Sequence, residues 1–383
     1  MKLSYLAENL DFSVIPKISK FAVQFKPVEY YTMGEPDLPS PLKVKEAVIQ
    51  AILNDDTYYP ETQGNSELRT LISQNYNYQY NTQLTEKNVL ITSGATGALY
   101  LTLLTLVSPN DEVIILTPHY SNYIGQIKNV GAVPILVELN QDFSLNLKNI
   151  EQAITHKTKA LLLNTPNNPL GTVFNKKEIL EIGGLAKKYN LFIIADEIYS
   201  KLIFEKKHCS FIHPKQANFS NTFLIDGLSK SHSMTGYRLG FVITPNKNAL
   251  HIMSELDEKI YGGVPHFIQK GAIAALKQES KYSSIIRHTY LKRRNQLYEG
   301  LKKIKNLDCM LPEATFYAFV NIKKTGLTSE EFVYKLIREK HIVVVPGTNY
   351  GKAGEGFIRI SYATTEQKIN HLINALNEFM KQF

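Results

Sequence analysis

The stretch FLIDGLSKSHSMTGYRLGF, residues 223–241, decides how the rest of the sequence is interpreted. It begins like a buried strand, breaks into small and polar residues around Lys230, and returns to an apolar strand over 239–244. A lysine held between two buried strands has a poorly hydrated ammonium group, which lowers its pKa and suits it to forming a Schiff base. Eight residues later, Arg238 offers the planar fork of donors that binds phosphate. Together they predict a pocket for pyridoxal 5′-phosphate.

Composition and charge narrow the class of protein. The chain has 383 residues, of which 44% are apolar and 20% charged, as expected for a globular enzyme of two domains. No apolar run is long enough to span a membrane and no signal-peptide core is present, so we expect no membrane partner. The net charge of +8 comes from dispersed lysines. Its densest run, residues 292–294, lies in a helical pattern and is expected to be a solvated face, so we expect no nucleic-acid partner.

The cysteines and histidines point to neither a disulfide framework nor a metal. Cys209 and Cys309 are the only cysteines, which predicts a reducing, cytoplasmic location. His208, Cys209 and His213 match no known ligand spacing, so we expect no metal and place them on the surface and in loops.

The order of apolar runs predicts the fold class, α/β. Seven strand-like runs occur at 89–92, 113–116, 133–137, 160–163, 191–195, 222–225 and 241–244, most of them separated by stretches long enough for helices. This alternation predicts a mostly parallel seven-stranded sheet in an α/β/α sandwich. Beyond residue 281, a long basic helix over 282–305 leads into a mixed α+β segment. We therefore predict an N-terminal arm and part of a small domain at 1–43, a large cofactor-binding domain at 44–280, and a small C-terminal domain at 281–383.

In such sheets, ligands bind beyond the carboxyl ends of the strands. After the first strand, SGATGAL (93–99) leads into a helix, so Gly94, Ala95 and Thr96 are a candidate phosphate cradle. A dinucleotide-binding turn is disfavoured because G-x-G-x-x-G is missing and no acidic residue ends the second strand.

Later strands end in further candidates. Tyr120 can stack on a flat ring or pack in the core, and the Asn168 amide can donate to a phenolic oxygen. Asp196 can keep a pyridine nitrogen protonated or cap a helix; the first interpretation is favoured because Tyr199 follows three residues later. Arg359 lies in an apolar strand and needs a partner, either a bound carboxylate or an internal ion pair.

Two loops near the N-terminus are less informative by themselves. Residues 1–30 are expected to form an N-terminal arm with irregular patterning, and a loop over 32–41 leads into a helix that opens at Ser40-Pro41 and runs to about Leu53. Gly34 in TMGEPDLPSP can let backbone approach a ligand or can be a plain turn glycine. Tyr59 in DDTYYPETQG would by itself be a packing residue.

Taken in order, these motifs resemble the class I/II aminotransferases, which are fold type I pyridoxal-phosphate enzymes. The resemblance covers almost the whole chain and rests on GEPDLPSP, YPETQGNSELR, TSGATGAL, NTPNNPLG, ADEIYSKL, DGLSKSHSMTGYRLGF, VVPGTNY and RISYATTE. The lysine segment looks like that of the PatA-like or aromatic/aspartate aminotransferase group of Gram-positive bacteria. Some members of that group act on N-acetyl-L,L-diaminopimelate.

The resemblance implies a role for each candidate residue. Lys230 would hold the cofactor and shuttle a proton, Asp196 would pair with its pyridine nitrogen, and Tyr120 would stack on its ring. The ring oxygen would be bound by Tyr199 and Asn168. The phosphate would be bound by a set of residues that includes one from a second subunit of a homodimer: Gly94, Ala95, Thr96, Arg238 and the partner's tyrosine, Tyr59. The substrate α-carboxylate would meet Gly34, Asn168 and Arg359.

Two positions depart from the family pattern. Gly227 stands where serine is common, so the resemblance implies that one phosphate contact is missing. Thr96 stands where some aspartate-specific relatives have a lysine that binds a distal carboxylate, which weakens a strict assignment to aspartate.

The expected reaction is a ping-pong transfer of an amino group from an L-amino acid of aromatic, aspartate or N-acetyl-L,L-diaminopimelate type to a 2-oxo acid such as 2-oxoglutarate. A carbon–sulfur β-lyase is the alternative within the same fold, because the same pocket can eliminate a β-leaving group. A pyridoxal-phosphate-binding regulator is a third, less favoured, because no DNA-binding segment precedes the enzyme-like arm.

Overall fold

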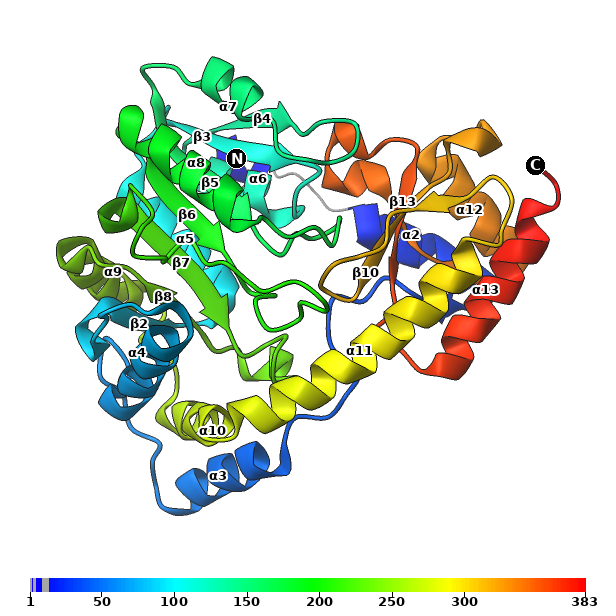
Figure 1. Cartoon of the computed structure of the whole chain (residues 1–383). Helices are drawn as coiled ribbons and strands as arrows, with labels where there is room; N and C mark the ends of the chain where they lie inside the picture. The colour runs from blue at the N-terminus through cyan, green and yellow to red at the C-terminus, as the bar shows by residue number, and fades with distance from the viewer. Residues whose placement is uncertain (1, 3–4, 9–13) are drawn as a thin grey trace.

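The centre of the molecule is a seven-stranded, mostly parallel sheet (Figure 1). The computed structural model describes residue 2, residues 5–8 and residues 14–383. The strand order is β2 (Val89–Thr92), β8 (Gly240–Ile243), β7 (Thr222–Gly227), β6 (Phe192–Asp196), β5 (Thr158–Asn164), β3 (Glu112–Thr117) and β4 (Val133–Glu138). Only β8 is antiparallel to its neighbours. The predicted strands and fold class are therefore confirmed.

Helices cover both faces of this sheet because its strands are apolar on both sides. One face packs on α5 (Gly94–Leu106), α6 (Asn122–Asn129) and α9 (Lys247–Ile260). The other packs on α4 (Ser66–Tyr80), α7 (Leu147–Ala153), α8 (Lys176–Lys188) and α10 (His266–Leu276). The helix α3 (Leu42–Leu53) packs mainly on α10, away from the sheet (Figure 1). Within β5, Leu161 and Leu163 face one layer while Ala160 and Leu162 face the other, as the two-residue period of a strand requires.

A second layer of structure forms beyond the long helix α11 (Glu279–Leu301), which runs from beside α10 to α13 (Figure 1). It contains a four-stranded sheet in the order β12 (Val345–Pro346), β13 (Phe357–Ser361), β10 (Tyr317–Asn321) and β9 (Asp308–Cys309), and a short pair, β1 (Glu29–Tyr30) with β11 (Ile342–Val343). The helices α12 (Ser329–Lys340) and α13 (Glu366–Met380) share its core. The domain limits at residues 43 and 280 stay a prediction.

The expected irregular arm is wrong for residues 14–22, which form α2 (Val14–Ala22), after the short α1 (Tyr5–Glu8). Ile18 and Ala22 lie in the core of the smaller layer, with Val14 and Phe21 packed against it. These positions follow the spacing of an amphipathic helix. Pro16 in the first turn obscures that spacing in the sequence, although proline is tolerated there. The rest of the expected arm includes residues outside the described part.

The solvated face expected at residues 292–294 is also wrong for two of its three cations. Arg294 is 2% exposed and forms an ion pair with Glu205 at 2.6 Å, and its guanidinium lies over the ring of Phe204. Arg293 is buried and pairs with Asp37 at 2.6 Å. Both acids are distant in sequence, so the helical pattern alone could not reveal them.

Along the described residues, no helix combines the length and apolar composition needed to cross a bilayer.

Candidate active site

A cavity of about 280 Å³ lies at the carboxyl ends of the parallel strands, close to the lower end of the size range of small-molecule sites. Ten of the predicted site residues line it: Gly34, Ala95, Thr96, Tyr120, Asn168, Asp196, Tyr199, Lys230, Arg238 and Arg359. They come from segments spread over more than three hundred residues. The fold thus brings to one place the residues that the motifs singled out.

Lys230 follows β7 in the turn predicted from the Gly/Ser-rich stretch, and its amine reaches the cavity. Its Nζ donates a hydrogen bond to the Gly34 carbonyl at 2.6 Å. Burial, together with the nearby positive charge of Arg238, lowers the pKa of Lys230 to about 8, although Asp196 acts in the opposite direction. A substantial fraction of the amine is therefore neutral near physiological pH and can act as a nucleophile.

Asp196 ends β6 and points into the same cavity. Its Oδ2 accepts a hydrogen bond from the Tyr123 hydroxyl at 2.7 Å, and its Oδ1 accepts one from the Ile198 amide at 3.2 Å. Burial raises the pKa of Asp196, while these two hydrogen bonds and the charge of Lys230 oppose the rise. The carboxylate is thus held in place to receive a cationic partner.

The sequence did not single out Tyr123. It lies in the first turn of α6, three residues after Tyr120, and the two rings meet edge to face. The only signal in the sequence was that this short segment contains a second tyrosine. In the structure the side chain of Tyr123 is buried.

A compact cluster of anion-binding donors forms where α5 begins. Gly94 has a φ of +72°, and a Cβ there would lie 2.7 Å from an Arg238 nitrogen. At Gly240 a Cβ would lie 2.4 Å from the Ala95 amide nitrogen. Arg238 itself adopts a left-handed conformation, with φ 53°. The two glycines thus let a guanidinium approach the amino end of α5, which favours a bound anion such as phosphate.

Gly227 departs from the family pattern for a visible steric reason. A Cβ at Gly227 would lie 3.0 Å from the Gly240 Cα and 3.0 Å from the Leu239 carbonyl oxygen, so a serine would crowd the β7–β8 pair. Ser229 lines the cavity instead, which the sequence did not predict.

Arg359 lies on β13 at the other side of the cavity and is buried. Its guanidinium lies 4.1 Å from the ring centre of Tyr317 and 5.0 Å from that of Tyr350. It donates to the Asn168 Oδ1 at 3.0 Å and to the Thr32 carbonyl at 2.7 Å. Within the described part of the chain no carboxylate pairs with it, and its Nε has no hydrogen-bond partner. Of the two partners expected from the sequence, the internal ion pair is not found there.

The remaining predicted residues differ in placement. The hydroxyl of Tyr199 lies 2.9 Å from that of Tyr317, and burial raises the pKa of Tyr199. Gly34 borders the cavity so closely that a Cβ would lie 2.9 Å from the Tyr317 hydroxyl. Tyr59, in contrast, is 94% exposed and does not line the cavity of its own chain.

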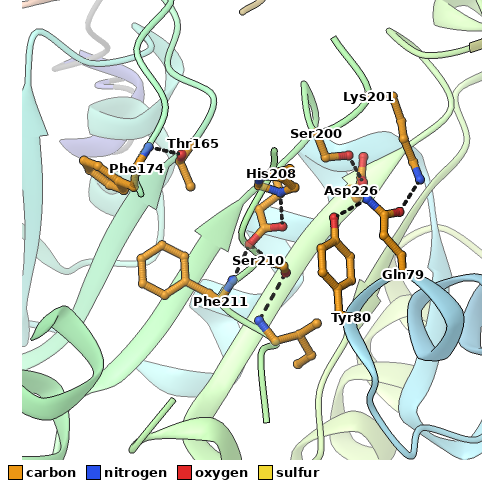
Figure 2. A network of polar contacts seen from close by, with 12 residues as sticks. Gln79, Tyr80, Thr165, Phe174, Ser200, Lys201, His208, Ser210, Phe211 and Asp226 are labelled. Carbon is orange, nitrogen blue, oxygen red and sulfur yellow. Dashed lines mark hydrogen bonds and ion pairs between the residues drawn. The ribbon is translucent and has the colours of Figure 1, made fainter. Parts of the chain in front are cut away.

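A network of buried polar contacts lies around the ends of β6 and β7 (Figure 2). Glu197 accepts hydrogen bonds from His208 at 2.8 Å, Ser210 at 3.0 Å and the Phe211 amide at 2.7 Å. His208 is buried, so its predicted surface position is wrong. Its partner is the residue next to Asp196, a pairing that the loop sequence does not show.

A second carboxylate of this network, Asp226, accepts hydrogen bonds from Tyr76 at 2.8 Å and Ser200 at 2.9 Å. In Figure 2, Ser200 and Asp226 lie next to each other. Burial raises the pKa of Asp226 to about 7. Three residues separate it from Lys230, so the network braces the turn that carries the amine.

The donor set fits one cofactor. An amine with a lowered pKa, a braced carboxylate, and an arginine at a helix amino end suit the aldehyde, the ring nitrogen and the phosphate of pyridoxal 5′-phosphate. A lysine, an aspartate and two arginines around a cavity in this fold define a fold type I pyridoxal-phosphate enzyme.

Comparison with known proteins gives the family. The sequence model of the aminotransferases of class I and II matches residues 30–376. An aspartate aminotransferase from Sulfolobus acidocaldarius is 37% identical over 92% of this chain and 90% of its own length. A probable N-acetyl-LL-diaminopimelate aminotransferase from Bacillus subtilis is 33% identical over 98% and 94%. The chain belongs to the class I and II aminotransferases, whose members of this kind depend on pyridoxal 5′-phosphate.

A solved structure supports the same conclusion. The aromatic aminotransferase from Pyrococcus horikoshii superimposes with a TM-score of 0.88 at 31% identity, over 95% of this chain and 99% of its own. These relatives are named as aminotransferases, and none of them as a lyase. The narrower assignment to a group from Gram-positive bacteria stays a prediction.

Proposed function

We propose that this aminotransferase moves an amino group from an L-amino acid to a 2-oxo acid such as 2-oxoglutarate in two half-reactions at one site. Donors of aromatic, aspartate and N-acetyl-L,L-diaminopimelate type are the starting candidates, because relatives with these names resemble the chain. The observation that carries the proposal is the Lys230 amine, whose pKa is lowered to about 8, in the same cavity as Asp196, Arg238 and Arg359.

Each residue of the cavity has a role in holding the cofactor. Arg238, with the backbone at Gly94 and Ala95 and the hydroxyl of Thr96, would bind the phosphate at the start of α5. Tyr120 would lie against the ring. Asp196 would accept the proton of the ring nitrogen, and the ring oxygen would meet Tyr199 and Asn168. When bound, the cofactor supplies an aldehyde carbon for the amine and a ring that withdraws electrons.

The chain then needs to bind the substrate and move one proton. Arg359, which lines the cavity, would bind the α-carboxylate through its guanidinium, and the rings of Tyr317 and Tyr350 beside it fix the plane of that group. The Lys230 amine, which is partly neutral, would take the proton from the substrate's α-carbon. It would then give this proton to the C4′ carbon of the cofactor.

A homodimer is part of the proposal. Tyr59 would reach the phosphate of the other subunit, which agrees with its exposure and its distance from the cavity of its own chain. The neighbouring helix α3 also exposes apolar residues, including Leu42 at 67% and Leu53 at 71%, as a surface that packs on a second chain would.

Mixed dimers provide the test of this arrangement. Lys230→Ala and Tyr59→Phe subunits should each have little activity alone. Their mixture should regain activity, because one of the two sites then contains both native residues. A monomer by light scattering, or a mixture no more active than either variant alone, would refute the shared site.

We also propose a cytoplasmic location. The support is that the sequence has two cysteines, and both are free thiols.

The test of the function is amino transfer by the purified protein loaded with pyridoxal phosphate. A panel of L-amino acids with 2-oxoglutarate should yield the matching 2-oxo acid and glutamate in equal amounts. Release of pyruvate and sulfide from cystathionine without any 2-oxo acid acceptor would instead indicate a lyase. The absence of turnover with every donor would contradict the proposed function.

A further inference from the structure

We propose that the cavity selects against amino acids whose side chains carry a carboxylate. This inference rests on the proposed function and names the substrate class of the same site. It concerns the space left over once the cofactor and the α-carboxylate are bound.

The inference rests first on the charged residues of the cavity. Among the described residues that line it, four are charged: Asp196, Lys230, Arg238 and Arg359. Each has a partner in the proposed function: ring nitrogen, aldehyde, phosphate and α-carboxylate. No further cation of the described chain lines the cavity, so a second carboxylate on the substrate would find no counter-charge there.

The inference rests secondly on the cavity walls that have no proposed role in binding the cofactor or the α-carboxylate. They are uncharged, and they include apolar, aromatic and neutral amide side chains: Ile15, Leu99, Tyr350, Asn122 and Gln126. Ile15 packs against the cluster that contains Tyr350, whose ring stacks on Arg359. A substrate side chain beside the bound α-carboxylate therefore meets methyl and ring surface. An unpaired carboxylate is strongly disfavoured at such a surface, whereas an apolar side chain is stabilised.

The proposed dimer does not supply the missing cation through the Tyr59 loop. The loop at 54–64, NDDTYYPETQG, contains Asp55, Asp56 and Glu61 and no lysine or arginine. Basic residues beside this loop have acidic partners: Arg69 faces Glu61 at 3.6 Å and His266 faces Asp56 at 3.7 Å. Lys259, in the segment whose Gly262 lies beside Tyr59, faces Glu255 at 3.4 Å. A partner that contributes Tyr59 thus brings negative charge towards the site, which disfavours a substrate with a distal carboxylate.

The half-reaction tests this inference without any acceptor. Holoenzyme is mixed with one donor at a time, and the change in cofactor absorbance gives a second-order rate constant for each. We expect phenylalanine, tyrosine, leucine and methionine to react at least about 100-fold faster than aspartate and glutamate, the size expected when a charge is left without a partner. Aspartate or glutamate reacting as fast as phenylalanine would overturn the inference and leave the amino transfer itself intact. If no donor of any class reacts, the proposed function fails as well.

Binding of unreactive carboxylates gives a second readout. By calorimetry on the holoenzyme, 3-phenylpropionate should bind more tightly than succinate, and the reverse order would contradict the proposal. Ile15→Lys adds a cation to the apolar wall and should raise succinate affinity relative to 3-phenylpropionate by about tenfold or more. Ile15→Met is the matched uncharged control and should keep the native order. An unchanged ratio in a folded Ile15→Lys protein would overturn the assignment of this wall.

Discussion

Replacing Tyr123 by phenylalanine tests whether its hydroxyl tunes the carboxylate of the site. The change removes one O–H group that donates to the Asp196 Oδ2 at 2.7 Å and leaves the ring in place. A hydrogen bond to a charged group contributes about 1.5–3 kcal/mol, or roughly one to two powers of ten in an equilibrium constant. Because Asp196 must be ionised to hold a protonated ring nitrogen, this loss should lower the rate by about 10- to 100-fold.

The pH dependence gives the sign of the effect. Burial raises the pKa of Asp196 and the Tyr123 hydrogen bond lowers it, so the pKa rises further in Tyr123→Phe. A smaller fraction of the carboxylate is then ionised at a given pH. The acid limb of the profile of kcat/KM should therefore move to higher pH, and the loss should be greater at about pH 6 than at about pH 9.

Tyr76→Phe is the matched control. Its hydroxyl is equally buried and donates to the Asp226 Oδ2 at 2.8 Å, but it lies outside the cavity. Both variants should lose a similar amount of stability by thermal unfolding, and only Tyr123→Phe should shift the acid limb. An unshifted limb in Tyr123→Phe, or an equal shift in both variants, would refute the reasoning.

Three further changes test other parts of the molecule. Arg359→Ala should raise the KM for every amino donor by about 100-fold or more, since a buried charge that pairs with a ligand contributes about 2–5 kcal/mol; an unchanged KM would remove it from the site. Asp257 has two buried carboxyl oxygens without hydrogen-bond partners, and burial raises its pKa to about 7. The pKa of Asp257 is higher in the folded than in the unfolded protein, so the native protein loses stability as pH rises from the unfolded pKa to the folded one. Asp257→Asn should therefore stabilise the protein by about 1–3 kcal/mol at pH 8 and little at pH 4. Equal unfolding midpoints for the native protein and Asp257→Asn at pH 8 would contradict this. Arg293→Met should loosen the Asp37 loop that carries Gly34 and raise KM more than it lowers kcat, and unchanged kinetics would show that the ion pair does not hold that loop.

The large sheet was predictable because its signals are local. Most of its strands are buried and therefore appear as short apolar runs, and several cavity residues follow such a run directly. Asp196 and Lys230 could be located for this reason, and the topology places them together at the carboxyl edge of the parallel sheet. Arg359 was located differently, as a charge within an apolar strand, and that strand belongs to the antiparallel four-stranded sheet across the cavity.

The missed features depend on contacts between distant segments. Arg294 looked solvated because its partner, Glu205, is 89 residues away in the chain. His208 looked like a loop residue because its carboxylate partner, Glu197, lies eleven residues earlier on the other side of a turn. The helix at Val14–Ala22 is stabilised by packing on the smaller layer, and its own sequence does not specify it strongly.

The central claim is that the Lys230 amine is the group that joins covalently to pyridoxal phosphate. Reduction of the holoenzyme with borohydride, followed by protease digestion and mass spectrometry, fixes the cofactor to the residue that holds it. We predict a phosphopyridoxyl group on the peptide containing Lys230. The group on any other lysine, or no modified peptide from a protein supplied with the cofactor, would contradict the account.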